Sequence, residues 1–368
     1  MTQRARFIKS KMTGGIFKQL LVIAMINFIL AACAAFNPAA IQPEKVFGTG
    51  SEPLLEPGQK VKIMSWNVQY MAGKNYVFFY DLLDGSGPDR RPSAEDITST
   101  VKDVARIIRR ENPDIVMLQE VDDNARRTDY EDQLALLLAL LPADYKFHAS
   151  AFYWQSSFVP HPKIMGKVGL KLSILSKFNI AKAVRHQLPL RKISALRQLF
   201  DLKRAVLEAR LPIKNGNDFI VMNTHLSAFA QGEDTMQRQV EHLKMLMDQY
   251  TKNGQSWILG GDFNLLPPGK TYQRLPDHQK KYYQEKTELE ILTSAYRSVP
   301  SLKEIDGNFP EKWYTFFSND PKITEPDRAI DFIFYADRLQ SEKHRVIRNN
   351  TLHISDHMPI VAEFIIPK

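Results

Sequence analysis

The chain has 368 residues, with 49 lysine and arginine residues against 41 aspartate and glutamate residues, which gives a formal net charge of +8. This length allows a sizeable core, either in one large α/β unit or in two smaller domains. Hydrophobic content of 44% and charged content of 24% exclude a disordered, fibrous or polytopic membrane chain. The single cysteine excludes an intrachain disulfide framework and a cysteine-rich zinc site. The positive charge raises the question of a nucleic-acid partner.

The N-terminal segment accounts for much of that charge. Residues 1–19 contain five basic residues and no acidic one, and without them 44 basic residues face 41 acidic ones, a net charge of +3. The apolar run Leu20–Ala32 is short for a bilayer span of about 20 residues, but it suits the apolar core of a signal peptide. It ends in Leu30-Ala31-Ala32-Cys33, which resembles a bacterial lipoprotein lipobox. That resemblance implies cleavage before Cys33 and acylation of its thiol.

We therefore predict a signal peptide with a lipobox over residues 1–33 and a proline-containing tether over 34–60. The alternative for the first segment is an uncleaved anchor helix with a packing cysteine. Both interpretations place the protein at a membrane surface outside the cytoplasm: in a bacterial cell envelope, lipid-anchored at the outer membrane or periplasmic face, or secreted. The residue Ala34 favours outer-membrane delivery by the same resemblance.

Short apolar runs alternate with amphipathic stretches from Val61 onward. The elements expected in chain order are a strand at Val61–Val68, a helix at Glu95–Arg110, strands at Asp114–Gln119, Leu170–Leu175, Ala205–Leu211 and Asp218–Asn223, a helix at Thr235–Tyr250, and strands at Ser256–Gly260, Ala329–Tyr335 and Ile360–Ile366. Because no repeat or long linker interrupts this series, we predict one α/β domain (α+β) over residues 61–368.

Polar side chains stand where several of these strands end. They occur in the fragments SWNV (Asn67), LQEV (Glu120), NTHL (Asn223, His225), GGDFN (Asp262, Asn264), IDFIF (Asp331) and SDHMP (Asp356, His357). A carboxylate at the end of a buried strand needs a cation or a donor beside it, and Mg²⁺ prefers oxygen ligands. Taken alone, Glu120 is better explained as a salt-bridged strand end than as a metal ligand, and each fragment alone is a weak signal.

Together and in this order, the fragments resemble those of the endonuclease/exonuclease/phosphatase superfamily of metal-dependent phosphoesterases, whose members include DNase I-like nucleases, inositol polyphosphate phosphatases and neutral sphingomyelinases. The resemblance extends over nearly all of the region from Ile63 to Ile366. It implies a four-layer α/β sandwich, in which two stacked mixed β-sheets are flanked by helices, with the site at one rim.

The resemblance also implies roles for individual residues. Glu120 would hold a divalent ion, Mg²⁺ or Mn²⁺, with Asn67 beside it and Asp356 assisting. Asp262 would orient or deprotonate the attacking water. The remaining expected roles are a supporting one for Asn264, phosphate contact for His357, orientation of His357 by Asp331, an acid toward the leaving group for His225, and substrate contacts for Asn223 and Thr315. Lys171 is expected either near the phosphate or in solvent.

Some features depart from better-known members. Gln69 stands where some nucleases carry an acidic metal-site residue, which weakens the analogy with abasic-site nucleases. Aromatic residues are concentrated in the segments 71–94 and 152–158, which could insert into a membrane, stack on bases or pack on the sandwich. Basic residues cluster over 185–204, a pattern that suits a nucleic-acid backbone, anionic lipids or a solvated face.

The sequence thus predicts a monomeric Mg²⁺-dependent phosphoesterase that hydrolyses a phosphodiester at the membrane surface, with a phospholipid, a sphingomyelin-like lipid or nucleic acid as substrate. The alternatives are a nuclease acting on extracellular DNA or RNA and a phosphomonoesterase acting on inositol phosphates. A binding protein without activity would be expected to have lost the metal and base positions, which are all present here. The residual charge of +3 gives the nuclease little extra support.

Overall fold

The computed structural model describes residues 36–48, 50–228 and 232–368. The predicted signal peptide and Cys33 lie outside these ranges, so both stay predictions. Within them, no helix combines the length and the apolar character needed to cross a membrane.

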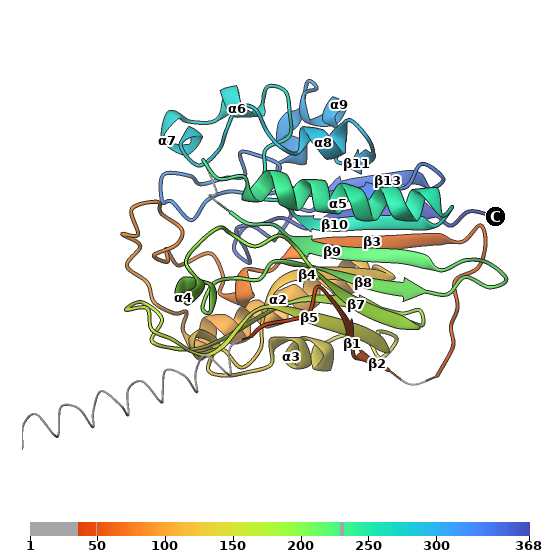
Figure 1. Cartoon of the computed structure of the whole chain (residues 1–368), viewed down its shortest axis with the longest axis horizontal. Helices are drawn as coiled ribbons and strands as arrows, with labels where there is room; N and C mark the ends of the chain where they lie inside the picture. The colour runs from red at the N-terminus through yellow and green to blue at the C-terminus, as the bar shows by residue number, and fades with distance from the viewer. Residues whose placement is uncertain (1–35, 49, 229–231) are drawn as a thin grey trace, which may run out of the picture.

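Two β-sheets form the centre of the described structure (Figure 1). The first sheet runs in the order β1 (Ile41–Glu44), β7 (Lys182–Gln187), β8 (Ala205–Leu211), β9 (Phe219–His225), β10 (Ser256–Asp262), β12 (Asp331–Tyr335) and β11 (Arg297–Val299). The second runs in the order β13 (Gln340–Val346), β14 (Ile360–Ile365), β3 (Lys60–Asn67), β4 (Ile115–Asp122), β6 (Gly166–Ser176), β5 (Phe147–Val159) and β2 (Val46–Phe47). Both sheets are mixed, because β9 and β10 pair in parallel, as do β3 and β4, among antiparallel neighbours.

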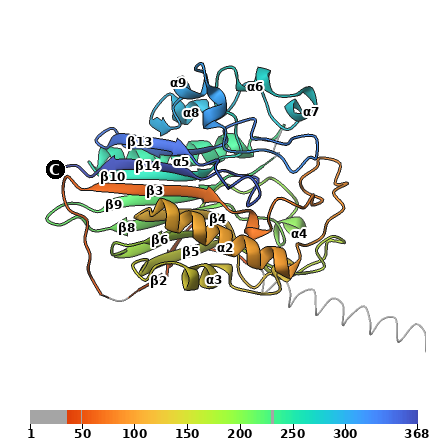
Figure 2. The same cartoon turned by 180° about the vertical axis from the view of Figure 1, so that it is seen from behind.

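Helices cover the outer face of each sheet. On the second sheet lie α2 (Ala94–Glu111) and α3 (Gln133–Leu140), which Figure 2 shows from behind. On the first sheet lies α5 (Thr235–Lys252), near the short helices α6 (Thr271–Arg274), α7 (Asp277–Lys280), α8 (Glu290–Thr293) and α9 (Leu302–Ile305). The other short elements are α4 (Ala195–Gln198), η1 (Gln69–Met71), η2 (Arg126–Thr128) and η3 (Pro310–Trp313). Local sequence sets the ends of α2: Ser93 accepts a hydrogen bond from the Asp96 amide, and Asn112 closes the helix in a left-handed conformation.

Alternating side chains along each strand separate two layers of core. In β8, Leu207 and Ala209 face the second sheet, whereas Val206 faces α5. Each fully buried aliphatic or aromatic side chain in these layers contributes about 1.5–3 kcal/mol. The two stacked sheets with helices on both outer faces confirm the predicted four-layer sandwich.

The structure also corrects the sequence prediction in places. The described part of the predicted tether over 34–60 is not wholly a linker, because β1 pairs with β7 and β2 pairs with β5, so each strand extends the edge of a sheet. Short edge strands of this kind carry little hydrophobic pattern, which is why the sequence gives no sign of them. The same applies to β13, whose residues are largely polar and exposed.

The ends of the central strands meet at the end of the sandwich opposite the C-terminus (Figure 1). The parallel pairs β3–β4 and β9–β10 end there, and β12 and β14 begin there because each runs antiparallel to its neighbour. The backbone at this edge departs from regular strand geometry at Glu120. Glu120 has a φ of +57° and lies at a break in the β4–β6 register, where a bulge redirects its side chain.

Candidate active site

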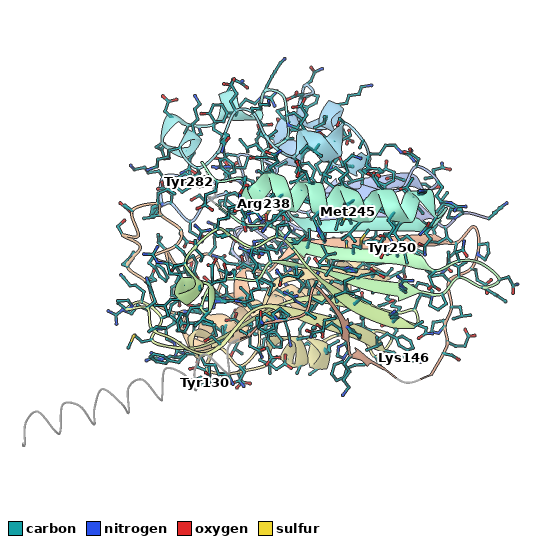
Figure 3. The ribbon with its side chains drawn as sticks, in the orientation of Figure 1. Tyr130, Lys146, Arg238, Met245, Tyr250 and Tyr282 are labelled. Carbon is teal, nitrogen blue, oxygen red and sulfur yellow. The ribbon has the colours of Figure 1, made fainter. Side chains whose placement is uncertain are left out.

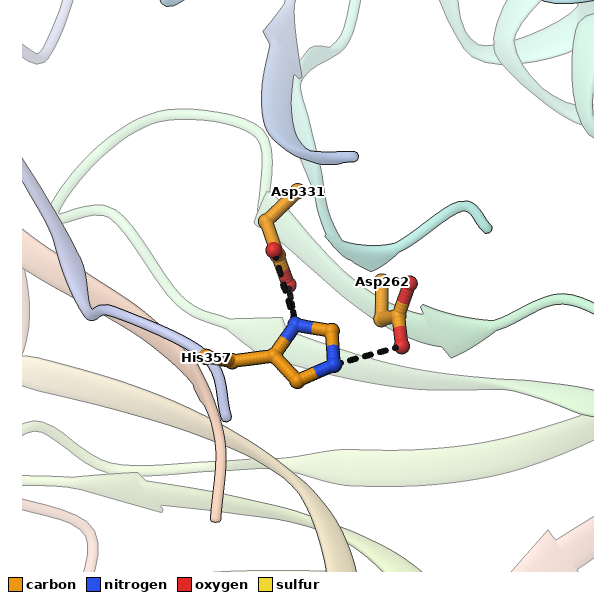
Figure 4. A group of neighbouring side chains, drawn as sticks. All are labelled: Asp262, Asp331 and His357. Carbon is orange, nitrogen blue, oxygen red and sulfur yellow. Dashed lines mark hydrogen bonds and ion pairs between the residues drawn. The ribbon is translucent and has the colours of Figure 1, made fainter. Parts of the chain in front are cut away.

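Three buried side chains form the centre of the site (Figure 4). Asp262 ends β10 and Asp331 begins β12, and the register of these strands places the two residues opposite each other. His357 lies in the segment before β14, where the Trp66 indole donates a 2.9 Å hydrogen bond to its carbonyl oxygen. The His357 ring lies between the two carboxylates, with Nδ1 2.9 Å from Asp331 Oδ2 and Nε2 3.5 Å from Asp262 Oδ2.

The charges of this cluster follow from burial and proximity. Burial alone would lower the pKa of the His357 imidazole, but the carboxylates of Asp331, Asp262 and Asp356 outweigh burial and raise it to about 10. His357 is therefore an imidazolium at neutral pH, which allows both ring nitrogens to donate. Burial raises the pKa of the Asp262 carboxyl to about 7, an effect that the His357 charge only partly offsets.

Donors surround the Asp262 carboxylate. Its Oδ2 accepts a 3.0 Å hydrogen bond from Asn67 Nδ2 and lies 3.3 Å from His225 Nε2, while its Oδ1 accepts a 2.9 Å bond from the Asn264 amide. The preceding Gly261 allows the close pairing of β9 and β10, since a Cβ there would lie 2.0 Å from the Thr224 carbonyl oxygen. The carboxylate that sequence resemblance assigns to water activation is thus fixed in orientation.

His225 has a different charge state from His357. Burial, helped by the positive charges of Arg204 and His357, holds the pKa of His225 well below its usual range. Its ring lies at the end of β9 with Nδ1 3.3 Å from the Tyr153 hydroxyl and 3.8 Å from Glu120 Oε1. A neutral imidazole in this position is an orienting or hydrogen-bonding group, in contrast to the acid expected from the sequence.

Glu120 and Asp356 supply the oxygen donors best suited to a hard divalent cation. Glu120 accepts a 3.3 Å hydrogen bond from Asn67 Nδ2, and burial together with the Asp356 charge raises its pKa. The Asp356 amide donates to Gln69 Oε1, which ties Gln69 into the same group. A carboxyl group whose ionisation is opposed by a neighbouring carboxylate, as that of Glu120 is, fits a divalent cation, because the cation would remove the repulsion. Gln69 therefore supports this site by a backbone contact and leaves the carboxylates to Glu120 and Asp356.

The donor atoms of Asp262, Asp331 and His357 also lie within 4.8 Å of one another, close enough for a metal ion. Both Asp331 oxygens, however, lie within 3.1 Å of His357 Nδ1. Because this contact occupies Asp331 and keeps His357 charged, the trio is better suited to handling protons and phosphate than to chelation.

The cluster opens into a cleft of about 810 Å³. Its walls include Phe79 and Tyr80 from the aromatic segment 71–94 and Trp154 from β5. Tyr282, labelled in Figure 3 near α7, lies on another wall, and its hydroxyl oxygen accepts a hydrogen bond from the Leu83 amide. The aromatic segments thus divide their roles: Phe78 and Tyr153 are buried, whereas other members line the cleft.

Three residues predicted to contact substrate do not line the cleft. Lys171 is buried on β6 and its Nζ lies 2.9 Å from carboxylate oxygens of Asp123 and Asp132, so it faces neither the cleft nor solvent. The Asn223 amide is fully used between the sheets, where it bonds Gln119, Leu118 and Ser173.

Thr315 is the third of these residues. Its buried hydroxyl accepts hydrogen bonds from the Ile330 and Asp331 amides, at 3.1 and 3.2 Å. The role of Thr315 is therefore to position Asp331, and through it His357. A small hydroxyl residue in the family's place was a correct signal for proximity to the site but not for contact with substrate.

Sequence reasoning missed the arginines of the cleft. Arg127, Arg204 and Arg328 all line it, and each guanidinium lies over an aromatic ring. Arg204 belongs to the basic run 185–204, but the run gave no sign that this member would be buried beside His225. Arg127 and Arg328 occur in ordinary polar sequence, where only the tertiary structure shows their place.

Comparison with known proteins finds a matching family model and several solved structures of similar fold. Residues 64–357 match the model of the Endonuclease/Exonuclease/phosphatase family. No curated protein matches the chain in sequence. An endonuclease/exonuclease/phosphatase from Beutenbergia cavernae DSM 12333 is 20% identical, with a TM-score of 0.58, over 84% of this chain and 72% of its own. The human Nocturnin catalytic domain with bound sulfate is 17% identical (TM-score 0.52; 87% of this chain, 96% of that one). ANGEL2, a 2',3'-cyclic phosphatase, is 16% identical (TM-score 0.53; 89% and 99%). At these identities the likeness to solved structures concerns the fold.

Proposed function

The chain belongs to the Endonuclease/Exonuclease/phosphatase family, whose members are phosphoester hydrolases that use divalent metals, and from this premise we propose that it hydrolyses a phosphodiester with Mg²⁺ as its metal. One observation carries the proposal: the Asp262 carboxylate, whose pKa is raised to about 7, lies against an imidazolium and an amide in a cleft. A base with a pKa near neutrality beside a fixed cation suits attack by water on a phosphoryl group.

In this mechanism Asp262 accepts the proton of the attacking water. Asn67 and the Asn264 amide hold its two oxygens, so the base keeps its direction during the reaction. His357, fixed by Asp331, donates from Nε2 toward the phosphoryl oxygens and balances their developing charge. The neutral His225, hydrogen-bonded near Tyr153, orients the substrate at the opposite side of Asp262.

Glu120 and Asp356 would hold the Mg²⁺, with Asn67 next to them. When bound, the ion would supply Lewis-acid polarisation of the scissile phosphate. Mg²⁺ is preferred to softer metals because carboxylate and amide oxygens are the donors at this position.

Hydrolysis of bis(p-nitrophenyl) phosphate tests the proposal. We expect turnover with Mg²⁺, loss of turnover in EDTA, and recovery when Mg²⁺ is returned in excess. Plasmid DNA, RNA, sphingomyelin vesicles and an inositol phosphate, assayed side by side, identify the natural class of ester. A folded protein that hydrolyses none of these with Mg²⁺ or Mn²⁺ contradicts the proposal.

We also propose that the enzyme acts at a membrane surface, through acylation of Cys33. The described chain begins at Phe36, whose ring lies 5.5 Å from the Arg185 guanidinium, and Arg185 in turn donates to the Lys203 carbonyl next to the cleft. Three residues span about 10 Å at most, so an acyl chain on Cys33 would hold the cleft side close to lipid. Cys33→Ala should move the protein from the membrane fraction to the soluble fraction and abolish labelling by palmitate; retention in the membrane fraction contradicts the anchor.

A further inference from the structure

Three arginines that line the cleft, Arg127, Arg204 and Arg328, each use an aromatic ring as a support. The guanidinium of Arg127 lies 3.5 Å from the Tyr70 ring centroid, that of Arg328 lies 5.2 Å from the Tyr283 ring, and that of Arg204 lies 5.1 Å from the Tyr153 ring. Stacking of this kind fixes a guanidinium plane while leaving its N–H groups available at the edge. The arginines are therefore held as rigid donors.

Two of the three guanidiniums are neutralised within the protein. Arg127 forms a bidentate pair with Asp122, at 2.7 and 2.8 Å. Arg328 binds both oxygens of Asp327. These two arginines are structural: their positive charges are balanced and their N–H groups are largely used.

Arg204 differs from both. Its side chain is only 9% exposed, yet within the described residues it forms no hydrogen bond and no ion pair, and its Nη1 is buried without a partner. The positive charge of Arg204 helps to lower the pKa of His225 and offsets a small part of the rise in the pKa of Glu120, which places Arg204 beside the reaction centre. A buried cation without a charged partner is energetically unfavourable, so such a site is complementary to an anion.

The strand register explains how Arg204 reaches this place. It directly precedes β8, and β8 pairs antiparallel with β9 through Val206 and Thr224, so the start of β8 lies next to the end of β9, where His225 stands. Backbone contacts hold Arg204 there, since its carbonyl oxygen accepts from the Leu188 amide and from Gln187. Arg204 thus has a fixed backbone at the cleft wall, and its Nη1 has no partner.

We propose that Arg204 binds a second anionic group of the substrate, so that the preferred substrate is a phosphodiester carrying another phosphate near the scissile one. The proposal rests on the proposed phosphodiesterase function and names its substrate class. His357, oriented by Asp331, already serves the scissile phosphate, which leaves Arg204 for a neighbouring one. Nucleic-acid strands and phosphorylated inositol headgroups both have this chemistry.

The same features disfavour a choline headgroup. The rings of Tyr70, Tyr153 and Tyr283 are already covered by guanidiniums, so these three cannot form an aromatic cage around a quaternary ammonium. A quaternary ammonium in this cleft would also lie near the unpaired charge of Arg204. Among the phosphodiesters considered from the sequence, sphingomyelin-like lipids are therefore the poorest match.

Matched pairs of substrates test the proposal. The first pair is the thymidine dinucleotide TpT with and without a 5'-phosphate, and the second is glycerophosphoinositol with and without a 4-phosphate. Glycerophosphocholine is the cationic comparison. The wild-type enzyme should favour the second-phosphate member of at least one pair by about 10-fold or more in kcat/KM, the size expected for a charge-assisted hydrogen bond. The pair that shows the preference identifies the source of the phosphate.

Arg204→Gln should bring that ratio close to one, chiefly through KM, and Arg204→Lys should restore part of it. Arg106→Ala, which removes an equal charge from an exposed position on α2, is the matched control and should keep the wild-type ratio. A ratio that Arg204→Gln leaves unchanged overturns the proposal. So does an equal loss on both members of a pair, because that result indicates a general effect on the site.

Binding separates a failure of this proposal from a failure of the hydrolase function. Calorimetry with Asp262→Asn and with Asp262→Asn/Arg204→Gln, both in Mg²⁺, uses the same compounds without turnover. Tighter binding of the second-phosphate member, lost in the double variant, supports the anion site even where no compound is hydrolysed. Equal binding of both members, or binding of neither, overturns it.

Discussion

Two buried carboxylates in the first sheet have opposite ionisation behaviour. Asp262, at the cleft end of β10, has its pKa raised to about 7 by burial, against which the His357 charge acts only in part. Glu208, in the middle of β8 and facing α5, is equally buried, but hydrogen bonds from His186, Tyr250 and Arg210 overcome the effect of burial and lower its pKa to about 2.

The difference lies in how the surrounding donors are used. Around Glu208, His186 Nε2 lies 2.6 Å from one oxygen, Arg210 Nε donates to the other at 2.7 Å, and Tyr250, labelled on α5 in Figure 3, also donates. That carboxylate is charged at neutral pH and stabilises the packing of α5 on the sheet. Asp262 is poised between its two protonation states, and such a balance is useful for catalysis but does little for stability.

The largest expected effect follows from removing the poised carboxylate. Asp262→Asn keeps the size of the side chain but removes the base, so kcat should fall by roughly 10²–10⁴-fold. The free energy of unfolding, measured by urea titration, should change little, because the variant avoids burying a charge and its amide oxygen can still accept one of the two bonds, from Asn67 or from the Asn264 amide. Substantial activity in the folded variant would exclude Asp262 as the base.

A smaller effect is expected from Asp331→Asn, because Asp331 acts through His357. Loss of an orienting partner of this kind typically costs roughly 10- to 100-fold in activity. Asp331 raises the pKa of His357, so its removal should lower that pKa and shift the high-pH limb of the pH profile of kcat toward lower pH. Arg106→Ala serves as the folded control, and a uniform loss of activity with an unshifted limb would contradict the positioning role.

The fold and the centre of the site could be predicted from sequence, because both follow from strand patterns. Buried strands such as β8 and β10 have continuous apolar runs, and the polar residues that follow them meet wherever strand ends meet. Strands β1, β2 and β13 escaped prediction because edge strands bury few side chains and so show no pattern of their own.

Contacts from segments without a motif could not be predicted. The sequence pattern places Lys171 on a strand, β6, that resembles one beside the family's site. In the structure, however, Lys171 forms ion pairs with Asp123 and Asp132, which lie in segments distant in sequence. Likewise, nothing in the sequence distinguishes Arg204 from Arg127. In the described structure Arg127 has a carboxylate partner, Asp122, whereas Arg204 has none. Charge pairing is a property of tertiary structure.

Substitution of Glu208 should lower the free energy of unfolding, whereas substitution of Asp262 should not. Glu208→Gln removes the negative charge and replaces one of the two acceptor oxygens by an NH2 group, so the three donors can no longer all be accepted and the free energy of unfolding should fall by about 3 kcal/mol. Urea unfolding at neutral pH measures this loss, with the exposed Glu311→Gln as control. A change below about 0.5 kcal/mol, the size typical of surface substitutions, would mean that this cluster does not stabilise the packing.

The smallest effect concerns the pH dependence of stability. The folded pKa of Glu208, about 2, lies below its ordinary value of 4.5, so its stabilisation is complete above pH 4.5 and is lost progressively as the pH falls toward 2. Between pH 5.5 and 3.5 the wild-type protein should therefore lose about 1–2 kcal/mol more stability than Glu208→Gln, whose side chain does not titrate. Parallel stability curves for the two proteins would show that Glu208 titrates normally when folded. In that case the donors around Glu208 would not lower its pKa. The difference between the two carboxylates would then come only from the raised pKa of Asp262 in the cleft.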